Sequence, residues 1–599
     1  MKAGAQRLTR VRAELTRQGL SGFIVPRADE HLGEYVPESA ERLAWLTGFT
    51  GSAGLALVLP DRAAVFSDGR YTLQLVQQTD PALWETLHLT AAPPSAWLAA
   101  HAKGPVGYDP WLMSEDGAAR FREAGVSLVA VTQNPVDVAW QDRPPPPQGP
   151  VVPQPLEYAG LACAEKRAQV ALTLAEARQD AAILTDPASI AWLLNIRGSD
   201  VGFTPFALGF AILHADGTAQ LFMDPAKLGP AAREWLGPDI TTTGREGLAP
   251  ALQALSGKRV RLDVSGAPAW FGQTLRAAGA TVLDGADPCA LPKACKNAVE
   301  QAGTRAAHIR DAVALCRFLH WFDTEGRGHT EMQAAARLLA FRAEDPLFRG
   351  ESFPAISGAG EHGAIIHYRA TPESDRQLSE NEAYLIDSGA QYPDGTTDVT
   401  RTLWTGPATP PDELRDRYTR VLQGHIALAT ARFPEGVSGP HLDAFARRAL
   451  WDAGLDYDHG TGHGVGSYLS VHEGPASISR LGKLVPLAPG MILSDEPGFY
   501  LPGQYGIRLE NLLLVERAEA APRRFLQFET LTLAPFNSRL LAPALLSEAD
   551  RAWLSAYHKL VVAHVGPLVT QATLDWLLEA ATPFLLPLPA SAEGRGKGG

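Results

Sequence analysis

"NEAYLIDSGAQYPDGTTDVTRTLW", residues 381–404, has the pattern of a β-hairpin. Residues 383–386 are apolar and predict a buried strand, and Pro-Asp-Gly at 393–395 predicts a turn. Residues 397–404 then predict the returning strand. A hairpin of this kind determines which side chains of its two strands share a face.

Two acidic residues, Asp387 and Asp398, lie on this hairpin. Folding about residues 392–393 places them opposite each other or one residue apart, with Cβ atoms roughly 5 Å apart on one face. Two negative charges at that distance repel each other by about 3 kcal/mol at an effective dielectric constant of 20. The hairpin therefore predicts a compensating positive charge close to both carboxylates.

The segment "MILSDEPGFYLPGQYGIRLENLLLV", residues 491–515, repeats this arrangement. Two apolar strand patterns flank a Pro-Gly turn at residues 502–503. Glu496 and Glu510 straddle the turn, so they too are predicted to oppose each other. One opposed pair of acids can arise by chance, but two pairs indicate a shared site.

A glycine-rich segment, "HGTGHGVGSYLSVHEGP" (residues 459–475), carries three histidines between the two hairpins. The alternative to a functional segment is a glycine loop with incidental histidines, and the context decides between them. Glycines around His463 allow a close approach of the backbone to bound ions. Imidazoles that do not bind metal can transfer protons near neutral pH.

Together these segments supply four carboxylates and one or two imidazoles without a cysteine, a donor set that suits divalent first-row metals. Four negative charges balance two divalent ions. Two metal ions about 3.5–4 Å apart, bridged by carboxylates and a water molecule, are a known arrangement for the hydrolysis of amides and phosphates.

The whole chain has 599 residues, of which 45% are hydrophobic and 20% are charged. Its length predicts roughly three or four domains. The formal net charge of -13 disfavours nucleic acid and anionic membranes as partners, because both require a basic protein face. No segment approaches the roughly 18 continuous apolar residues of a membrane span.

The chain has four cysteines, at positions 163, 289, 295 and 316. So few cysteines predict a reducing, cytoplasmic location. Cys289 and Cys295 do not form a CxxC pair, and no second cluster completes a zinc site. We therefore expect buried or incidental thiols.

The N-terminal part of the chain reads as two related units. Residues 1–20 lack the apolar stretch of a signal peptide, and their pattern predicts a helix that Gly19 can end. The proline-rich segment 143–155 predicts a connector and a domain boundary. A similar order of strand and helix patterns occurs on both sides, with Trp45 and Trp192 in matching places. This suggests two copies of one α/β unit, and chance recurrence of common patterns is the alternative.

After residue 296 the pattern changes to a long helix, followed by a helix that starts at Thr330 with a Thr330–Gln333 capping box. Mostly short strands and turns are expected from there to about residue 540. Helices are predicted within 547–565 and 572–581, and the tail at 590–599 is expected to be disordered.

The acidic pairs and the histidine segment occur in an order that resembles the pita-bread metallopeptidases, which comprise methionine aminopeptidases, prolidases and aminopeptidase P. The blocks "GAIIHYRA", "YLIDSGAQYPDGTTDVTRT", "HGTGHGVGSYLSVHEGP", "SDEPGFY" and "GIRLEN" resemble those of the large, three-domain cytosolic type of aminopeptidase P. The resemblance covers nearly the whole chain, including residues 26–54.

This resemblance implies an α/β protein with two related N-terminal domains of the creatinase type, at residues 1–150 and 156–300. A pita-bread α+β catalytic domain at 301–540 and a C-terminal helical extension at 541–599 would follow.

The resemblance also implies an activity, namely hydrolysis of the N-terminal Xaa-Pro bond by a hydroxide that bridges two divalent metal ions. The ions are usually manganese, with cobalt or zinc as alternatives. Glu496 would relay a proton to the leaving nitrogen, His367 and His472 would bind the substrate carbonyl, and His459 would transfer a proton. The implied metal ligands are Asp387, Asp398, His463, Glu496 and Glu510.

The implied partners are peptides with proline in second position and a second copy of the chain in a homodimer. Prolidase, which acts on Xaa-Pro dipeptides, is the first alternative, and the greater length of this chain disfavours it. A non-enzymatic pita-bread scaffold is the second, and such scaffolds are expected to have lost ligands.

Other ionisable residues are interpreted as structural. A helix-face or core role is expected for His320, His425 and His441. Solvated or capping acids are expected at Asp443, Asp452, Asp456 and Asp458.

Overall fold

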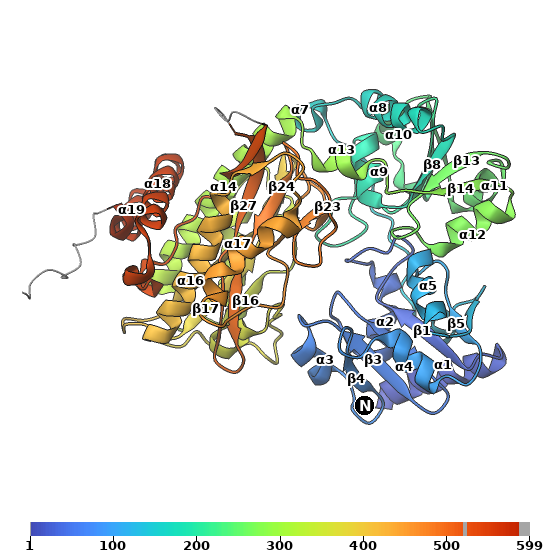
Figure 1. Cartoon of the computed structure of the whole chain (residues 1–599), viewed down its shortest axis with the longest axis horizontal. Helices are drawn as coiled ribbons and strands as arrows, with labels where there is room; N and C mark the ends of the chain where they lie inside the picture. The colour runs from blue at the N-terminus through green and yellow to red at the C-terminus, as the bar shows by residue number, and fades with distance from the viewer. Residues whose placement is uncertain (1, 519–523, 586–599) are drawn as a thin grey trace, which may run out of the picture.

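A computed structural model describes residues 2–518 and 524–585 of the chain. The expected disordered tail at 590–599 lies outside these residues. Figure 1 shows three parts: two smaller α/β domains on one side, and a larger domain whose C-terminal helices lie on the far side from them. Among the residues described, no helix has the length and hydrophobicity that a membrane crossing needs.

The first domain is built on a six-stranded sheet in the order β4-β3-β2-β1-β5-β6. Its strands are β1 (Gly22–Pro26), β2 (Leu55–Val58), β3 (Ala63–Ser67), β4 (Glu85–His88), β5 (Val106–Tyr108) and β6 (Leu128–Ala130). Its helices are α1 (Lys2–Arg17), α2 (Arg42–Thr47), α3 (Thr72–Gln78), α4 (Pro94–His101), α5 (Glu115–Glu123) and α6 (Pro135–Ala139).

The second domain has a six-stranded sheet in the order β12-β11-β10-β8-β13-β14. Its strands are β8 (Ala181–Leu184), β10 (Phe210–His214), β11 (Ala219–Phe222), β12 (Ile240–Thr243), β13 (Arg259–Leu262) and β14 (Thr281–Asp284), and β7 (Val152–Pro153) pairs with β9 (Ile196–Arg197) beside them. Its helices are α7 (Leu156–Ala159), α8 (Cys163–Glu176), α9 (Pro187–Leu194), α10 (Pro230–Leu236), α11 (Leu248–Gln253), α12 (Ala269–Ala277) and α13 (Ala290–Ala294).

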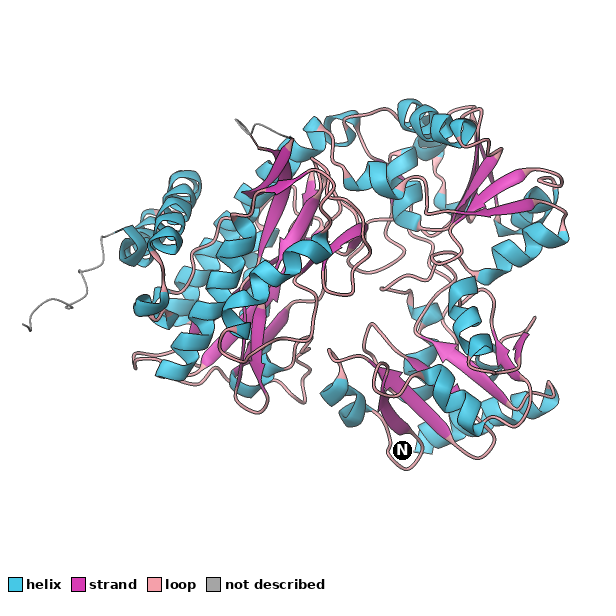
Figure 2. Cartoon of the chain, viewed as in Figure 1, coloured by secondary structure: helices cyan, strands magenta, loops and turns pink. Residues whose placement is uncertain are grey.

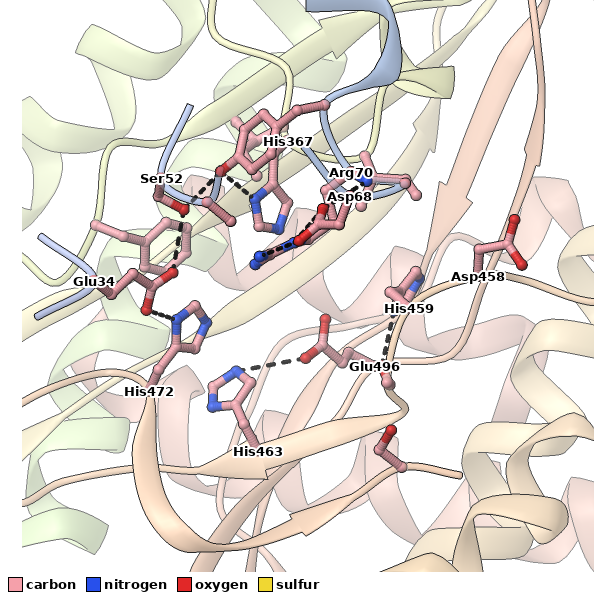
Figure 3. Close-up of a pocket in the computed structure, with 18 of the residues that line it drawn as sticks. Glu34, Ser52, Asp68, Arg70, His367, Asp458, His459, His463, His472 and Glu496 are labelled. Atoms are coloured by element: carbon pink, nitrogen blue, oxygen red, sulfur yellow. Dashed lines mark hydrogen bonds and ion pairs between the residues drawn. The ribbon is translucent and has the colours of Figure 1, made fainter. Parts of the chain in front are cut away.

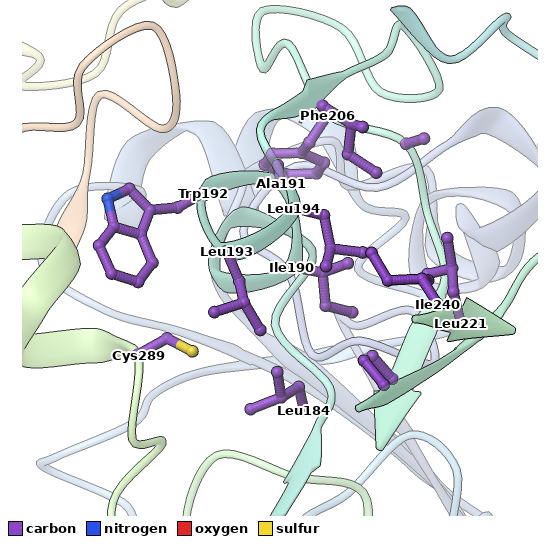
Figure 4. Close-up of a cluster of buried hydrophobic side chains, with 14 of the residues drawn as sticks. Leu184, Ile190, Ala191, Trp192, Leu193, Leu194, Phe206, Leu221, Ile240 and Cys289 are labelled. Atoms are coloured by element: carbon purple, nitrogen blue, oxygen red, sulfur yellow. The ribbon is translucent and has the colours of Figure 1, made fainter. Parts of the chain in front are cut away.

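The two sheets have the same topology, which confirms the prediction of two copies of one unit. In each, the first strand is antiparallel to the second strand of the sheet and parallel to the fifth. Trp45 on α2 and Trp192 on α9 lie in the helix that follows the first strand, and both are buried. Figure 4 shows Trp192 in the second core, together with the buried thiol of Cys289.

The third domain begins with α14 (Ala298–Glu325) and α15 (Glu331–Ala343), and the predicted Thr330–Gln333 capping box is present. Helices α16 (Asp412–Ala429) and α17 (Gly439–Trp451) also belong to it, so the expectation of mostly strands and turns up to residue 540 was wrong. Leu414, Tyr418 and Val421 recur at helical spacing and are buried, a pattern that predicts a helix.

The strands of this domain form several small sheets and one of six strands, with helices packed against them (Figure 2). The three-stranded sheets contain β15 (Gly350–Glu351), β18 (Ala390–Tyr392) and β19 (Gly395–Thr396), and β16 (Ile356–Ala359), β17 (Ala383–Ser388) and β20 (Val399–Trp404). The six-stranded sheet contains β21 (Phe433–Pro434), β22 (Gly462–Gly464), β23 (Glu473–Ile478), β24 (Ile492–Asp495), β27 (Asn511–Arg517) and β28 (Phe525–Thr530), and β25 (Gly498–Leu501) pairs with β26 (Tyr505–Arg508).

Two C-terminal helices, α18 (Glu548–Val565) and α19 (Gln571–Leu585), pack against each other and against α14. Both helices were predicted from the sequence. They lie away from the two N-terminal domains (Figure 1).

Candidate metal centre and active site

The second hairpin has the predicted register. Strand β24 pairs with β27 so that Asp495 faces Asn511, and β25 pairs with β26 so that Gly498 faces Arg508. The same register across the gap between these ladders places Glu496 opposite Glu510. Both carboxylates therefore belong to one face, as predicted.

The turn of the first hairpin is centred one residue later than predicted, and this shifts the pairing of its strands by two residues. Asp387 faces Thr400, so Asp398 is two positions away from direct opposition. The reason is the turn, because Tyr392 pairs with Gly395 and the chain reverses at Pro393 and Asp394. An offset of two residues keeps Asp387 and Asp398 on the same face of the strands.

The predicted metal-binding residues lie in one cavity, and three of them come close together. Asp398, His463 and Glu510 each offer a ligand atom within 4.8 Å of the other two. His463 Nε2 also lies 3.4 Å from Glu496 Oε1. Asp387 joins them in lining a cavity of about 1130 Å³, which all four carboxylates and His463 share. Figure 3 shows His463 and Glu496 pointing toward each other in this cavity.

Glycines bring the His463 strand between its neighbours. A Cβ atom at Gly462 would collide with the carbonyl oxygen of Ser494, and one at Gly464 with that of Glu473. These glycines therefore permit close approach of the backbone to the adjacent strands. The sequence had predicted a close approach of the backbone to bound ions.

The protein compensates the charge of these carboxylates only in part. Arg508 Nη2 donates to Asp387 Oδ2 at 2.6 Å and supplies part of the positive charge that the sequence predicted. Three of the buried oxygens of these site carboxylates have no hydrogen-bond partner among the described residues, namely Asp387 Oδ1, Asp398 Oδ1 and Glu510 Oε1. Unpartnered buried carboxylate oxygens are costly unless a cation binds them, so the residues present fit a metal centre.

Burial shifts the protonation of these acids. It raises the pKa of Asp387 to about 6 and that of Glu496 to about 7, and it raises the pKa of Glu510 well above its usual range. Burial opposes the charged form of His463, yet Asp398 and Glu496 raise the pKa of this histidine to about 9. The cavity therefore favours positive charge among its carboxylates.

Three further histidines predicted as site residues line the same cavity. His367 Nδ1 is 3.0 Å from the Tyr71 hydroxyl, and His459 Nε2 is 2.8 Å from the Tyr500 hydroxyl. Burial lowers the pKa of His459 to about 3 and that of His367 well below its usual value, so both are neutral at neutral pH. Neutral imidazoles can donate or accept a hydrogen bond without adding charge.

No site residue was predicted in the N-terminal domains, but the first domain contributes to the cavity wall. Glu34, Ser52, Arg70 and Tyr71 line it, and Ser52 Oγ is 2.8 Å from the Tyr71 hydroxyl (Figure 3). Nothing in the local pattern of these residues indicates a site, because their partners lie hundreds of residues later. Arg508 had a sequence signal in the "GIRLEN" block beside Glu510.

The histidines interpreted as structural have that role. His425 is buried in the core, His320 stacks on Trp576, and His441 takes part in the capping box of α17. For the four acids the expectation was partly wrong. Asp452, Asp456 and Asp458 are exposed, as expected, and Asp458 also lines the cavity. Asp443 instead is buried and bound to Arg447.

Comparison with known families assigns each part of the chain. The model of metallopeptidase family M24 matches residues 302–517, and that of the C-terminal region of this peptidase matches 524–584. Models of the creatinase/prolidase N-terminal domain match residues 7–138 and 142–300.

Individual proteins are similar over nearly the full length. A probable Xaa-Pro aminopeptidase P from Laccaria bicolor is 38% identical over 97% of this chain and 93% of its own. Xaa-Pro aminopeptidase 2 from Sus scrofa is 36% identical over 96% of this chain and 88% of its own.

Solved structures agree. The X-prolyl aminopeptidase from Caenorhabditis elegans, described as a cytosolic enzyme with a di-nuclear active site, covers 97% of this chain and 100% of its own, with a TM-score of 0.91 and 32% identity. A Xaa-Pro dipeptidase from Bacillus anthracis covers 62% of this chain and 99% of its own at 22% identity and a TM-score of 0.52, which is a similarity of fold alone. Because its relatives align over nearly its whole length, the chain belongs to metallopeptidase family M24, among the Xaa-Pro aminopeptidases with two creatinase-type N-terminal domains.

Proposed function

We propose that this metal-dependent Xaa-Pro aminopeptidase binds its two divalent ions through five side chains and releases one residue from peptides with proline second. The convergence of Asp398, His463 and Glu510 within 4.8 Å carries this proposal. Five intact donors in one cavity also oppose a non-enzymatic scaffold. The ligands would be Asp387, Asp398, His463, Glu496 and Glu510.

Manganese is the ion that we propose for this site, with cobalt or zinc as alternatives. Four carboxylates and one imidazole form an oxygen-rich donor set, which suits harder divalent ions better than a thiolate site would. When bound, two such ions acidify a water molecule and polarise the carbonyl group of the substrate.

Glu496 is the residue that we assign to proton relay. Its Oε1 accepts a hydrogen bond from Ser494 Oγ at 3.1 Å, which fixes the carboxylate against the strand. In the absence of metal, burial raises the pKa of Glu496 to about 7, so this carboxylate takes up a proton more readily than a solvated glutamate does. The recipient would be the nitrogen of proline as it leaves.

Three histidines that line the cavity would bind the substrate or transfer a proton. Tyr71 holds His367 through Nδ1, which leaves Nε2 to interact with the carbonyl oxygen before proline. His472 would act from the opposite side of the cavity, with its Nδ1 held by Glu34. His459 receives a hydrogen bond from the Tyr500 hydroxyl, which also accepts one from Arg508 Nη1 at 2.8 Å. Held in this way, His459 would transfer a proton.

Activity and metal content test the function together. We expect about two manganese ions per chain, cleavage of Xaa-Pro-Xaa peptides, and little cleavage of Xaa-Pro dipeptides. Asp398→Ala should lose both bound metal and hydrolysis, whereas Asp452→Ala, an exposed acid, should lose neither. Hydrolysis by a metal-free protein would contradict the mechanism, and turnover of dipeptides alone would indicate a prolidase.

A homodimer is the assembly that we propose, with the cytoplasm as its location. Leu481 and Leu484 are 92% and 71% exposed, and Gly482 between them lies against Pro440 at the start of α17. A second copy of the chain would cover these apolar side chains. Light scattering should give the mass of a dimer, and a Leu481→Glu variant should give that of a monomer; a monomeric wild type would contradict the proposal.

A further inference from the structure

A buried tyrosine of the C-terminal helices hydrogen-bonds to the interior of the catalytic domain. Tyr557 on α18 is buried and stacks on Trp553, with ring centroids 5.1 Å apart. Its hydroxyl donates to the Ala534 carbonyl at 2.8 Å and accepts a hydrogen bond from Arg401 Nη2 at 3.0 Å. The helix that carries Tyr557 lines no part of the cavity.

Arg401 connects this hydroxyl to Glu510, which lies between β26 and β27. The guanidinium is fully buried and lies over the Phe536 ring, 4.4 Å from its centroid. Nη1 donates to the Glu510 carbonyl at 2.6 Å, and Nη2 donates to Asn511 Oδ1 at 2.8 Å. A buried guanidinium with its donors in a rigid fork holds its acceptors in one geometry.

The same network continues to the end of β24, directly before Glu496. Asn511 Nδ2 donates to His425 Nε2 at 3.1 Å, and His425 Nδ1 donates to the Asp495 carbonyl at 3.1 Å. Asp495 precedes Glu496, and Asn511 follows Glu510. The buried groups therefore hold the two backbone segments that present the opposed glutamates.

We propose that the C-terminal extension positions the metal centre, with Tyr557 acting through Arg401 on the placement of Glu510 and Glu496. The proposal rests on these glutamates being ligands, as argued above. Groups that hydrogen-bond behind metal ligands orient them, and their loss commonly weakens metal binding by roughly 10- to 100-fold. Tyr557 and Arg401 are positioning residues, because neither touches the cavity.

Tyr557→Phe tests this with minimal change, because it removes the hydroxyl and keeps the stacked ring. The matched control is Tyr418→Phe, which removes another buried hydroxyl, one that accepts from the Asn537 amide at 3.1 Å. Manganese dissociation constants are measured by competition with a chelator in the absence of substrate, alongside Tm. We expect about tenfold weaker manganese binding for Tyr557→Phe, restoration of its activity by excess manganese, and unchanged affinity for Tyr418→Phe.

Equal manganese affinity in Tyr557→Phe and wild type would overturn the proposal and leave α18 with a role in stability alone. Arg401→Lys keeps the positive charge but loses the several donors of the guanidinium, so it should weaken manganese binding more than Tyr557→Phe does. If Arg401→Lys does not fold, the result for Tyr557→Phe decides. Since substrate is absent from the binding measurement, a wild type that binds two ions without cleaving Xaa-Pro peptides would contradict the proposed function and not this inference.

Discussion

The imidazole Nδ1 of His472 lies 2.5 Å from the carboxylate Oε2 of Glu34, a residue 438 positions earlier in the chain. This contact joins the first domain to the catalytic domain at the wall of the cavity. Burial opposes the charged form of Glu34, yet the neighbouring His472 lowers the pKa of this acid. Glu34 is thus an anion that fixes the orientation of an imidazole in the cavity wall.

Replacement of Glu34 tests this role. Glu34→Ala should lower kcat/KM on Xaa-Pro-Xaa peptides by about 100-fold, because a misplaced catalytic group costs about that factor. Manganese content should stay unchanged, since Glu34 is not among the proposed ligands. Glu38→Ala, an exposed acid of the same segment, serves as the control. Equal kcat/KM values for the two variants would show that Glu34 has no role in catalysis.

A second buried cluster supports the same histidine from the other side. Glu473, next to His472, accepts hydrogen bonds from Lys293 Nζ at 2.9 Å and Lys296 Nζ at 2.5 Å, and all three side chains are buried. These lysines lie at the junction of α13 and α14, so the cluster ties the second domain to the active-site loop.

Glu473→Ala leaves two buried ammonium groups without their carboxylate, so we expect a destabilisation of about 3–5 kcal/mol. Glu473→Gln keeps an acceptor and should be milder. Denaturant unfolding followed by fluorescence measures the difference, with Glu548→Ala on the surface as control. An unchanged unfolding midpoint in Glu473→Ala would show that the cluster does not stabilise the fold.

Local patterns made part of the site predictable. The turn residues of each hairpin place its two acids on a common face, and the acids then imply a cation. The single-residue error at Asp387 arose because a turn can reverse at either of two adjacent residue pairs, and only the strand pairing of Tyr392 with Gly395 decides.

The cavity residues of the first domain could not be predicted, because their position depends on long-range packing. Glu34 and Tyr71 have no local feature that separates them from ordinary surface residues, and only the docking of the first domain makes them cavity residues. The helices α16 and α17 were predictable in principle, since their buried residues recur at helical spacing.

Removal of metal should make stability depend on pH. The folded state raises the pKa of Asp387 to about 6 and that of Glu496 to about 7, above their ordinary values of 3.8 and 4.5. In the metal-free protein the protonated carboxyls of Asp387 and Glu496 are the forms that the fold favours. Their contribution to stability is therefore fully present below about pH 4 and is lost as the pH rises through 6 to 7.

Bound cations stabilise the ionised carboxylates, so the increase in Tm on addition of manganese should be larger at pH 8 than at pH 5. Differential scanning calorimetry of metal-free and manganese-loaded protein at both pH values measures this. In Asp398→Ala the difference between the two pH values should shrink. A manganese effect that is equal at pH 5 and pH 8 would contradict the assignment of these carboxylates as ligands.

The hydroxyl of Tyr71 provides the remaining test, because it links the first domain to His367. Tyr71→Phe removes one hydrogen bond to the imidazole and should cost about 1 kcal/mol of transition-state stabilisation, about a fivefold loss of kcat/KM. Tyr35→Phe is the control, since Tyr35 lines the same cavity, whereas the hydroxyl that bonds to His367 is that of Tyr71. Steady-state kinetics on one Xaa-Pro-Xaa peptide separates the variants, with Tm to verify folding. A loss confined to KM would mean that Tyr71 binds substrate directly, whereas a loss in kcat supports its action through His367.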